Sequence, residues 1–357
     1  MKTYTKFLIL IFFKSLLYVS SIMFSLVFIL NLLSELEFFK ELNIENHFPI
    51  FLSLLNSPDL IFEMFPFIFL ITTQLFFIKL FTNNEIEVLK YSGLRNSKIL
   101  VILSIVSIIT GIIITLIFYN FSSNLKNLYL ELKSPYAADG KYLAVITKNG
   151  LWIKDEINGK IMIINSFEIN KNFLLNNFIT EFDSKYRVIR NLKSDKIDIS
   201  NKEWLIFNAK IYKQNNYEVK RLIKIKTNFD YKRINSLYSN LSSLNIFQLY
   251  ELRENYKRLN YSLIEIDLQF LKLLSYPLFL FLITLFSSLI MFRVKRYDST
   301  TFKITLGLFL SVIIYYANNF FFVLGSTEKL PLLIAVFFPL LGLTLLNGLM
   351  LKNINEK

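Results

Sequence analysis

The stretch that decides the fold is "KILVILSIVSIITGIIITLIFYN", residues 98–120, in which the only charged residue is the first. The hydrocarbon core of a bilayer is about 30 Å thick, and a helix needs roughly 20 apolar residues to cross it. This stretch is therefore long and apolar enough to span a membrane. A short polar insert precedes it and a long polar block follows it, so the rest of the chain can be read outward from this span.

The composition as a whole is that of a membrane protein. The chain has 357 residues, of which 54% are hydrophobic and 37 are Phe, and its mean hydropathy is +0.44. A soluble protein has too much surface to carry that apolar content. With no Cys and with His47 as the only histidine, we expect no disulfide, no metal cluster and no cofactor. The lysines behind the net charge of +13 are scattered, which favours anionic lipid over nucleic acid as the partner.

Six spans are predicted, three on each side of the polar block. They cover about 12–33, 60–81, 98–120, 270–292, 302–324 and 330–351. The predicted organisation is therefore residues 1–123 with three transmembrane helices, a polar domain at 124–262, and residues 263–357 with three more. The apolar run from Phe7 to about Leu33 has no small-residue cleavage site, so we expect it to stay as a membrane anchor.

The charges of the short loops predict the orientation, because basic loops stay on the cytoplasmic side. The loop after span four, "RVKRYDSTTFK", is basic, and Lys2 and Lys6 precede span one, so both termini are expected in the cytoplasm. The loop after span one is acidic and is expected outside; it holds Glu35, Glu37, Glu41 and Glu45 beside Lys40. The polar block then faces outward, away from the cytoplasm.

The polar block has the sequence of an all-β domain. Segments such as "GLWIKD", "GKIMIINSFEI" and "EWLIFNAKIY" are short, partly alternating and rich in β-branched or aromatic residues. Hairpin turns are expected at Asn149-Gly150 and Asn158-Gly159. Seven or more such strands predict an antiparallel sandwich or a jelly-roll-like domain, with Trp152 and Trp204 in its core. A helical segment at about 245–260 is expected to lead back to the membrane.

The insert before the deciding stretch, "TNNEIEVLKYSGLRNSK" at residues 82–98, predicts a short cytoplasmic helix over about 84–95. Asn84 is placed to cap its start together with Glu87, and Gly93 is a natural residue just past its end. We expect Ile86, Leu89 and Gly93 to form one face that enters a partner, with Val88 beside it. The alternative is a solvated connector helix.

No sequence pattern indicates an active site. The chain has no G-x-x-x-x-G-K-[ST] motif, so ATP must be handled by another subunit. Glu63, near the outer end of span two, is read either as facing a cavity or as facing head groups. Asn318 and Asn319 in span five are expected to hydrogen-bond to a neighbouring helix. Lys126 and Lys133 are two helical turns apart and so share a face that is either solvated or phosphate-binding.

Several segments together carry a family resemblance. The cytoplasmic "NNEIEVLKYSGL", the "SPDLIFEMFP" that enters span two, the "NGLWIKD" of the β domain and the three-plus-three layout resemble the LptF/LptG permeases of the lipopolysaccharide exporter. The resemblance covers essentially the whole chain. It is closer to the LptG branch, through Gly150, Leu151, Trp152, Lys154 and Asp155.

The resemblance implies a permease subunit of an ABC transporter in the bacterial inner membrane, which is not itself an enzyme. Such a subunit works with a related, LptF-like permease and a cytoplasmic LptB-like ATPase dimer. It extracts lipopolysaccharide from the membrane and passes it to a periplasmic bridge of the LptC/LptA type. The short cytoplasmic helix of this family docks on the ATPase, and the resemblance carries that coupling role to Asn84, Glu85, Ile86, Val88, Leu89 and Gly93.

The lipid cavity of this family is formed mainly by spans one, two and five. The candidates for its wall and gate here are Phe24, Phe28, Asn31, Phe309 and Ile313. The family has basic residues for lipid phosphates near the outer end of span one, where this chain has Asn31, Ser34, Glu35 and Glu37. The remaining candidates for phosphate or head-group binding are Lys40, Lys126 and Lys133.

Three alternatives remain open at this point. The chain could be the sister permease, LptF, or the permease of another lipid or lipoprotein exporter with a similar layout. In a different class, it could be a membrane-anchored β domain that acts as a scaffold or sensor without transporting anything. A scaffold would have no reason to stimulate an ATPase.

Overall fold

The structure is a computed structural model that describes residues 3–40, 44–45, 47–133, 136, 143–147, 150–157, 159–170, 172–213, 216–231, 234, 241–258, 262–293 and 300–352. The chain divides into two compact units. The first, a membrane unit, holds Met1–Tyr129 and Asp267–Lys357, and the second, mainly a β-sheet, holds Leu130–Ile266. The loop at 294–299, on which the predicted orientation partly rests, lies outside the described residues.

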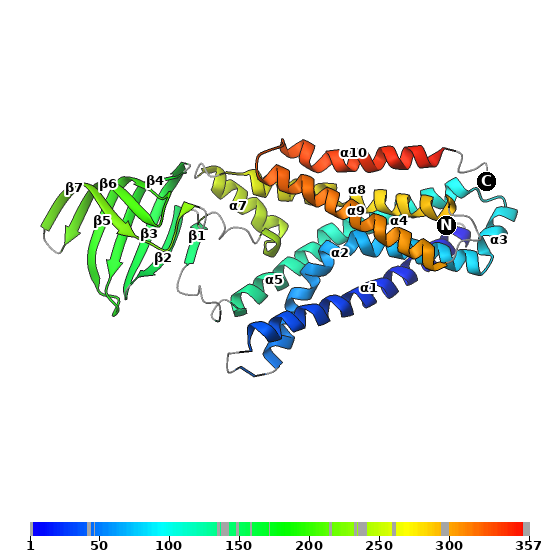
Figure 1. The fold of residues 1–357 in the computed structure, drawn as a ribbon, viewed down its shortest axis with the longest axis horizontal. Helices are drawn as coiled ribbons and strands as arrows, with labels where there is room; N and C mark the ends of the chain where they lie inside the picture. Colours follow the sequence, from blue (N-terminus) through cyan, green and yellow to red (C-terminus); the bar gives the residue numbers. More distant parts are fainter. Residues whose placement is uncertain are drawn as a thin grey trace. The chain divides into compact units, whose positions relative to one another are not determined.

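Six helical segments are long and apolar enough to cross a membrane, which confirms the predicted spans (Figure 1). The first five are longer than the apolar stretches that predict them, and the sixth, Leu332–Leu351, is slightly shorter. The third is continuous from Asn96 to Lys133 but is interrupted by one π-helical turn, Ile114–Phe118. The segments are α1 (Thr3–Phe38), α2 (His47–Thr82), α4 with η1 and α5 (Asn96–Ile113, Ile114–Phe118, Tyr119–Lys133), α8 (Ile264–Arg293), α9 (Thr300–Ser326) and α10 (Leu332–Leu351).

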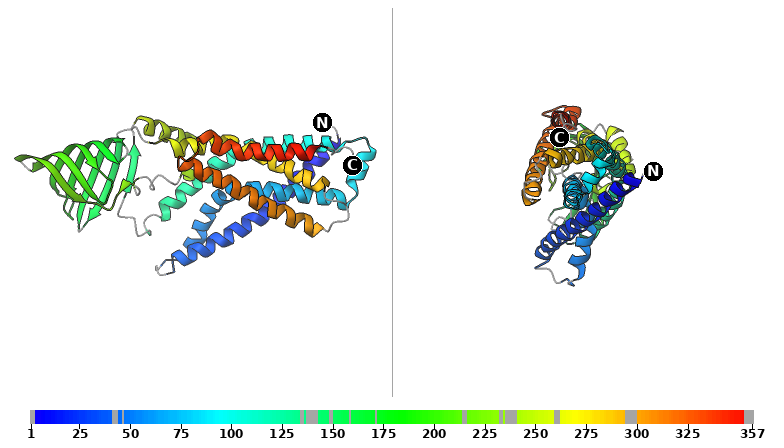
Figure 2. Two further views of the ribbon diagram at one scale, coloured as in Figure 1. Left: turned by 45° about the horizontal axis from the view of Figure 1, so that its top comes forward. Right: turned by 90° about the vertical axis from the view of Figure 1, so that its right-hand side faces the viewer.

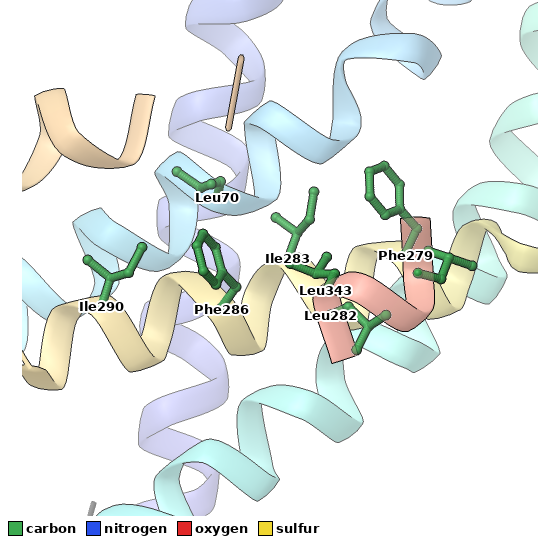
Figure 3. Packing of buried hydrophobic residues seen from close by; sticks show 8 residues of the cluster. Leu70, Phe279, Leu282, Ile283, Phe286, Ile290 and Leu343 are labelled. Carbon is green, nitrogen blue, oxygen red and sulfur yellow. The ribbon is translucent and has the colours of Figure 1, made fainter. Parts of the chain in front are cut away.

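Helices α2 and α8 form the centre of the membrane unit. The share of the most apolar window that is buried is 67% in α2 and 72% in α8, but only 17% in α1 and 11% in α9. The core cluster joins Leu70 of α2 to Ile283, Phe286 and Ile290 of α8, and Leu343 of α10 packs against it. Figure 3 shows the three α8 side chains turned toward α2. The outer helices α1 and α9 therefore keep most of their apolar surface uncovered.

Polar contacts connect the central helices, and one of them satisfies a carbonyl that has no helical donor. Pro66 has no N–H to offer the carbonyl of Phe62 one helical turn earlier, and the Tyr276 hydroxyl of α8 donates a hydrogen bond to that carbonyl. The Asn347 amide of α10 donates to the carbonyl of Leu282 of α8 at 3.0 Å. In hydrocarbon such bonds hold helices together because no water can replace them.

The approach of α9 to α2 depends on a residue without a side chain. A Cβ built at Gly307 of α9 would lie 1.7 Å from Nε2 of Gln74, a fully buried residue of α2. Small residues at such crossings let helix backbones come close in a membrane. Figures 1 and 2 show α9 lying between α10 and α2. The few buried residues of α9 thus lie at specific contacts, and the rest of the helix faces outward.

The second unit contains one antiparallel sheet of seven strands in sequential order, β1 to β7. This confirms the predicted all-β domain inserted between spans three and four. The connectivity among the described strands is up-and-down. The strands are β1 (Leu143–Thr147), β2 (Gly150–Ile157), β3 (Lys160–Asn170), β4 (Phe173–Phe182), β5 (Val188–Asp198), β6 (Glu203–Lys213) and β7 (Asn216–Lys226). Helix α7, Ile246–Arg258, lies in the stretch where a return helix is expected.

Two ladders of buried apolar side chains cross the sheet and explain its jelly-roll-like shape. The first contains Ile153, Ile164, Ile179, Leu192 and Ile211, and the second contains Ile169, Leu174, Ile197 and Ile206. Every member is at most 3% exposed. On β3 to β6, the two ladders are separated by odd numbers of residues. Alternation alone would put them on opposite faces of a flat sheet, one of which would be exposed.

A crease between the ladders resolves this conflict. Asn176 and Asn208 have positive φ, 54° and 50°, within β4 and β6, and such residues interrupt the alternation of a strand. Ser194, buried on β5 between the ladders, donates to the carbonyls of Lys196 and Phe207 at 2.9 and 2.6 Å. The sheet therefore bends along this line, and both ladders enclose one apolar interior. Figure 2 shows the curvature.

Local predictions for the β domain are partly confirmed. Ile157 pairs with Lys160 across a two-residue turn in which Gly159 has φ of 74°, as expected for the hairpin at 158–159. Asn149 and Asn158 lie outside the described residues. Trp204 is 1% exposed and donates Nε1–H to the carbonyl of Phe229 at 2.7 Å, so it is a core residue. Trp152 is 40% exposed, and its predicted place in the core is wrong.

Candidate functional site

The short helix between spans two and three is α3, Glu85–Tyr91. Its end follows the predicted pattern: Gly93 has φ of 82°, its N–H bonds to the carbonyl of Lys90 at 2.9 Å, and the N–H of Leu94 bonds to that of Leu89 at 2.9 Å. This pair of bonds is a Schellman motif, which fixes where the helix stops. The helix starts within one residue of the predicted position, but the predicted cap is wrong, because Asn84 has φ of 55° and its side chain makes no capping hydrogen bond.

The apolar face that was expected to enter a partner is covered by this chain itself. Ile86 and Leu89, expected to enter a partner, are 4% and 8% exposed and are buried within this chain. Val88 and Tyr91 are 66% and 90% exposed. They are three positions apart and so lie on the same side of the helix. We call Val88 and Tyr91 the outer face of α3.

The candidates for a lipid cavity lie on the two least covered helices. Phe24 of α1 is exposed and Phe28 is half-buried, while Phe309 and Ile313 of α9 are exposed. On α9 the exposed large side chains follow one helical stripe, since Phe309 and Ile313 continue to Tyr316 and Phe320. These apolar surfaces can face acyl chains or a second protein, and no other helix in the described part of this chain covers them.

Asn31, the remaining cavity candidate, belongs to a buried polar contact between α1 and α2. Its Nδ2 donates to the carbonyl of Ser53 at 3.1 Å, and Asn56 Nδ2 donates to its Oδ1 at 3.0 Å. One turn later, Glu35 is 2% exposed, and the Tyr129 hydroxyl of α5 donates to Glu35 Oε1 at 2.8 Å. The assignment of Glu35 to an acidic outer loop is therefore wrong.

The head-group lysines separate into three different environments. Lys126 of α5 pairs with Asp59 of α2 at 2.8 Å, and their side chains are 15% and 6% exposed, so the solvated reading of Lys126 is wrong and its binding of a phosphate stays a prediction. Lys133 is half-buried at the end of α5. Lys40 is exposed in the turn after α1. Of the three, only Lys40 has the exposure that contact with a lipid phosphate requires.

A cavity of about 300 Å³ lies between α2, α8, α9 and α10. Glu63 lines it, which decides between the two readings of that residue, and Lys272 Nζ lies 3.9 Å from Glu63 Oε1. Asn318 and Asn319 also line it. Neither amide has a side-chain hydrogen-bond partner among the described residues, so their expected bonds to a neighbouring helix are wrong.

Sequence reasoning missed three groups of polar residues that the fold brings together. Lys272 was not expected at the cavity, although a lysine this close to an apolar span is a signal for it. Asp59 and Lys126 are 67 residues apart, and no spacing rule connects them. Asp155, which contributes to the family resemblance, is fully buried and accepts hydrogen bonds from Thr227 and from the backbone of Asn228 at 2.7 and 2.9 Å. Asp155 therefore anchors the segment after β7.

Comparison with known proteins agrees with this architecture. The model of the family described as "Lipopolysaccharide export system permease LptF/LptG" matches residues 6–353, which is nearly the whole chain. A comparison with curated proteins gives no match. The match includes both halves of the membrane unit and the sheet between them. The chain therefore belongs to the LptF/LptG family of lipopolysaccharide export system permeases.

Proposed function

We propose that this chain is the LptG-like permease that extracts lipopolysaccharide from the bacterial inner membrane and passes it to a periplasmic bridge. The single observation that carries the proposal is the family match over residues 6–353, in a chain with six membrane-spanning helices and an inserted β domain. The LptG assignment over LptF rests on the segment from Gly150 to Asp155. The partners proposed are an LptF-like permease, an LptB-like ATPase dimer and an LptC/LptA-like bridge.

The uncovered helices support a cavity shared with a second permease. Apolar surface that the chain leaves uncovered can be buried by acyl chains. Helices α1 and α9 offer such surface, because only 17% and 11% of their most apolar windows are buried. We propose that Phe24, Phe28, Phe309 and Ile313 form one wall of a cavity whose other wall is the related permease. Lys40, exposed beyond α1, would contact the lipid phosphates from the rim.

The outer face of α3 supports the coupling to the ATPase. Val88 and Tyr91 are large, apolar or aromatic, and exposed on a helix of only seven residues that a Schellman motif terminates. Aromatic residues with such exposure are typical anchors in protein interfaces. ATP-driven movement of the ATPases would push this face, while Ile86 and Leu89 transmit the movement because they are buried within the membrane unit.

The β domain supports the onward step. Both apolar ladders face one interior, so an acyl chain that enters between the two sides of the crease meets apolar side chains along each ladder, with the buried Ser194 at the crease between them. All members are at most 3% exposed, so the interior has to open for a lipid to enter. Ile206 lies in this interior, whereas Ile163 pairs with Lys154 and Thr180 beside the ladder position Ile164. Ile206 is thus the better crosslinking position.

The test is purification of the native complex from membranes, followed by mass spectrometry of the subunits and bound lipid. The proposal expects a second permease, an ATPase and lipopolysaccharide to be recovered together. A chain with Val88→Asp and Tyr91→Ala on the outer face serves as the matched control, and should lose the ATPase but keep the second permease. Recovery of the wild-type chain without any ATPase would overturn the transport proposal in favour of a scaffold.

A further inference from the structure

The cavity between α2, α8, α9 and α10 carries an inference of its own. All of its lining comes from this one chain, and the four candidates for the proposed lipid wall, Phe24, Phe28, Phe309 and Ile313, do not line it. Its volume of about 300 Å³ is at the lower end of the range for small-molecule sites, roughly 300–1,000 Å³. A site of this size takes a head group or a small solute, not the body of a large glycolipid.

The charges of the cavity specify a ligand that carries both signs. Glu63 supplies one carboxylate and Lys272 one ammonium group, so the formal charges of the pair cancel. An anionic ligand would meet Glu63, and a cationic ligand would meet Lys272. A ligand that bears an ammonium and a phosphate can place each group against the opposite charge, and such charge-assisted hydrogen bonds are stronger than neutral ones.

The ion pair is loose enough to be replaced by such a ligand. Its atoms are 3.9 Å apart, and the side chains of Lys272 and Glu63 are 34% and 48% exposed. Lys272 Nζ also lies 5.3 Å from the ring centre of Phe322, which is another partner for a cation. By contrast, the Asp59–Lys126 pair is closed, at 2.8 Å and with side chains only 6% and 15% exposed. The Glu63–Lys272 pair therefore leaves both charges accessible to a ligand, whereas the Asp59–Lys126 pair does not.

The uncharged part of the lining adds hydrogen-bonding groups without partners. Asn318 and Asn319 each offer donors and an acceptor, and neither has a partner among the described residues. Phe279 and Leu340 form an apolar side of the same cavity and belong to the core cluster shown in part in Figure 3. The site thus combines both charges and two amides with an apolar border against which an alkyl chain can lie.

We infer that this cavity binds the phosphoethanolamine head group of a bilayer lipid. The ammonium would lie at Glu63 and the phosphate at Lys272, with Asn318 and Asn319 completing the hydrogen bonds. A primary ammonium carries N–H donors that a trimethylammonium lacks, so the site distinguishes phosphatidylethanolamine from phosphatidylcholine. The inference goes beyond the proposed function, because it concerns a lipid resident in the permease and not the lipid it exports.

The experiment uses the intact complex in phosphatidylglycerol nanodiscs doped with either phosphatidylethanolamine or phosphatidylcholine. Lipid retained after extraction into detergent is quantified by mass spectrometry. The expected order is phosphatidylethanolamine above phosphatidylcholine and phosphatidylglycerol. Glu63→Gln and Lys272→Met should each lower the retained phosphatidylethanolamine about tenfold, the effect of losing one hydrogen bond to a charged group. Asn319→Ala, which removes no charge, should lower it by a smaller factor.

Lys79→Met is the matched control, because Lys79 lies on α2 outside the cavity and bonds to Ser15 at 3.2 Å. It should leave the retained lipid unchanged, and size-exclusion profiles establish that each variant is assembled. Unchanged retention in both charge variants would overturn the inference, and so would preferential retention of phosphatidylglycerol. If soluble glycerophosphoethanolamine binds to the site while no lipid is retained, the assignment to a bilayer lipid is overturned.

Discussion

The outer face of α3 gives the sharpest test of how this chain is coupled to its ATPase. Val88→Asp places a charge on the exposed stripe, whereas Leu89→Ala, one residue later, removes a side chain that is 8% exposed inside the chain. The two side chains are adjacent in sequence and about 100° apart around the helix, so one is exposed and the other is buried. We expect Val88→Asp to weaken binding of the ATPase, and Leu89→Ala to weaken the fold of this chain.

The magnitudes follow from the exposure of the two side chains. Full burial of a Val side chain contributes about 1.5–3 kcal/mol, and Val88 still has 66% of its surface to bury. Loss of that contact, with a carboxylate in its place, should cost about 2 kcal/mol, or roughly 30-fold in affinity. Leu→Ala at a buried position costs about 2–5 kcal/mol of stability in soluble cores. Leu89→Ala should therefore lower the stability of this chain without adding a charge to the surface that meets the ATPase.

The assay measures both quantities on the same preparations. ATPase binding is titrated on permease complexes in nanodiscs, and the unfolding temperature of the permease is followed in parallel. Val88→Asp should reduce affinity at unchanged unfolding temperature, and Leu89→Ala should lower the unfolding temperature. Normal ATPase affinity for Val88→Asp would refute the assignment of the outer face as the ATPase contact. A stable Leu89→Ala protein with weakened ATPase binding would show instead that the face of Ile86 and Leu89 contacts the ATPase.

Further predictions concern the internal contacts. Asp59→Asn should lower stability by about 3 kcal/mol, because Lys126 loses its buried partner; the double variant with Lys126→Met should regain most of it in thermal unfolding. Gly307→Ala should separate α9 from α2 and lower the unfolding temperature, and adding Gln74→Ala should relieve the clash and raise that temperature again. If the double variant does not recover, the contact between Gly307 and Gln74 does not set the distance between the two helices. Ser194→Ala should destabilise the sheet unit by about 1–3 kcal/mol in urea, since the buried Ser194 hydroxyl no longer donates to the carbonyl of Phe207 on the neighbouring strand; no change would argue against the crease.

The membrane helices could be predicted because the signal is local. Twenty consecutive apolar residues have few alternatives to a membrane-spanning helix, so all six spans were found. The helices extend beyond the apolar stretches, as α1 does to Phe38, because a helix continues through polar residues when a neighbour supplies partners. Glu35 shows this: it reads as a loop residue, yet Tyr129 holds it inside the fold.

The face of α3 could not be predicted because periodicity identifies a stripe but not its direction. Ile86 and Leu89 share a face whether that face meets this chain or another protein. Val88 and Tyr91 form an equally regular stripe, and only the position of α3 against the membrane unit decides between them. The ion pairs Asp59–Lys126 and Glu63–Lys272 were missed for a related reason, since each joins residues from different helices.

The crease of the β domain depends on two asparagines that strand patterns do not single out. Asn176 and Asn208 adopt positive φ within strands, and each moves the buried ladder to the other parity of its strand. A reading that assumes regular alternation therefore assigns half of the positions to the wrong face.

The most direct test of the central claim is ATP-dependent extraction of lipopolysaccharide from proteoliposomes that contain the purified complex. Lipopolysaccharide with a photoreactive acyl chain is incorporated in the membrane, and crosslinks to the β domain are measured with and without ATP hydrolysis. The account predicts crosslinks at Ile206 that require ATP and are lost in Val88→Asp. Equal crosslinking without ATP, or none with a fully active ATPase, would contradict it.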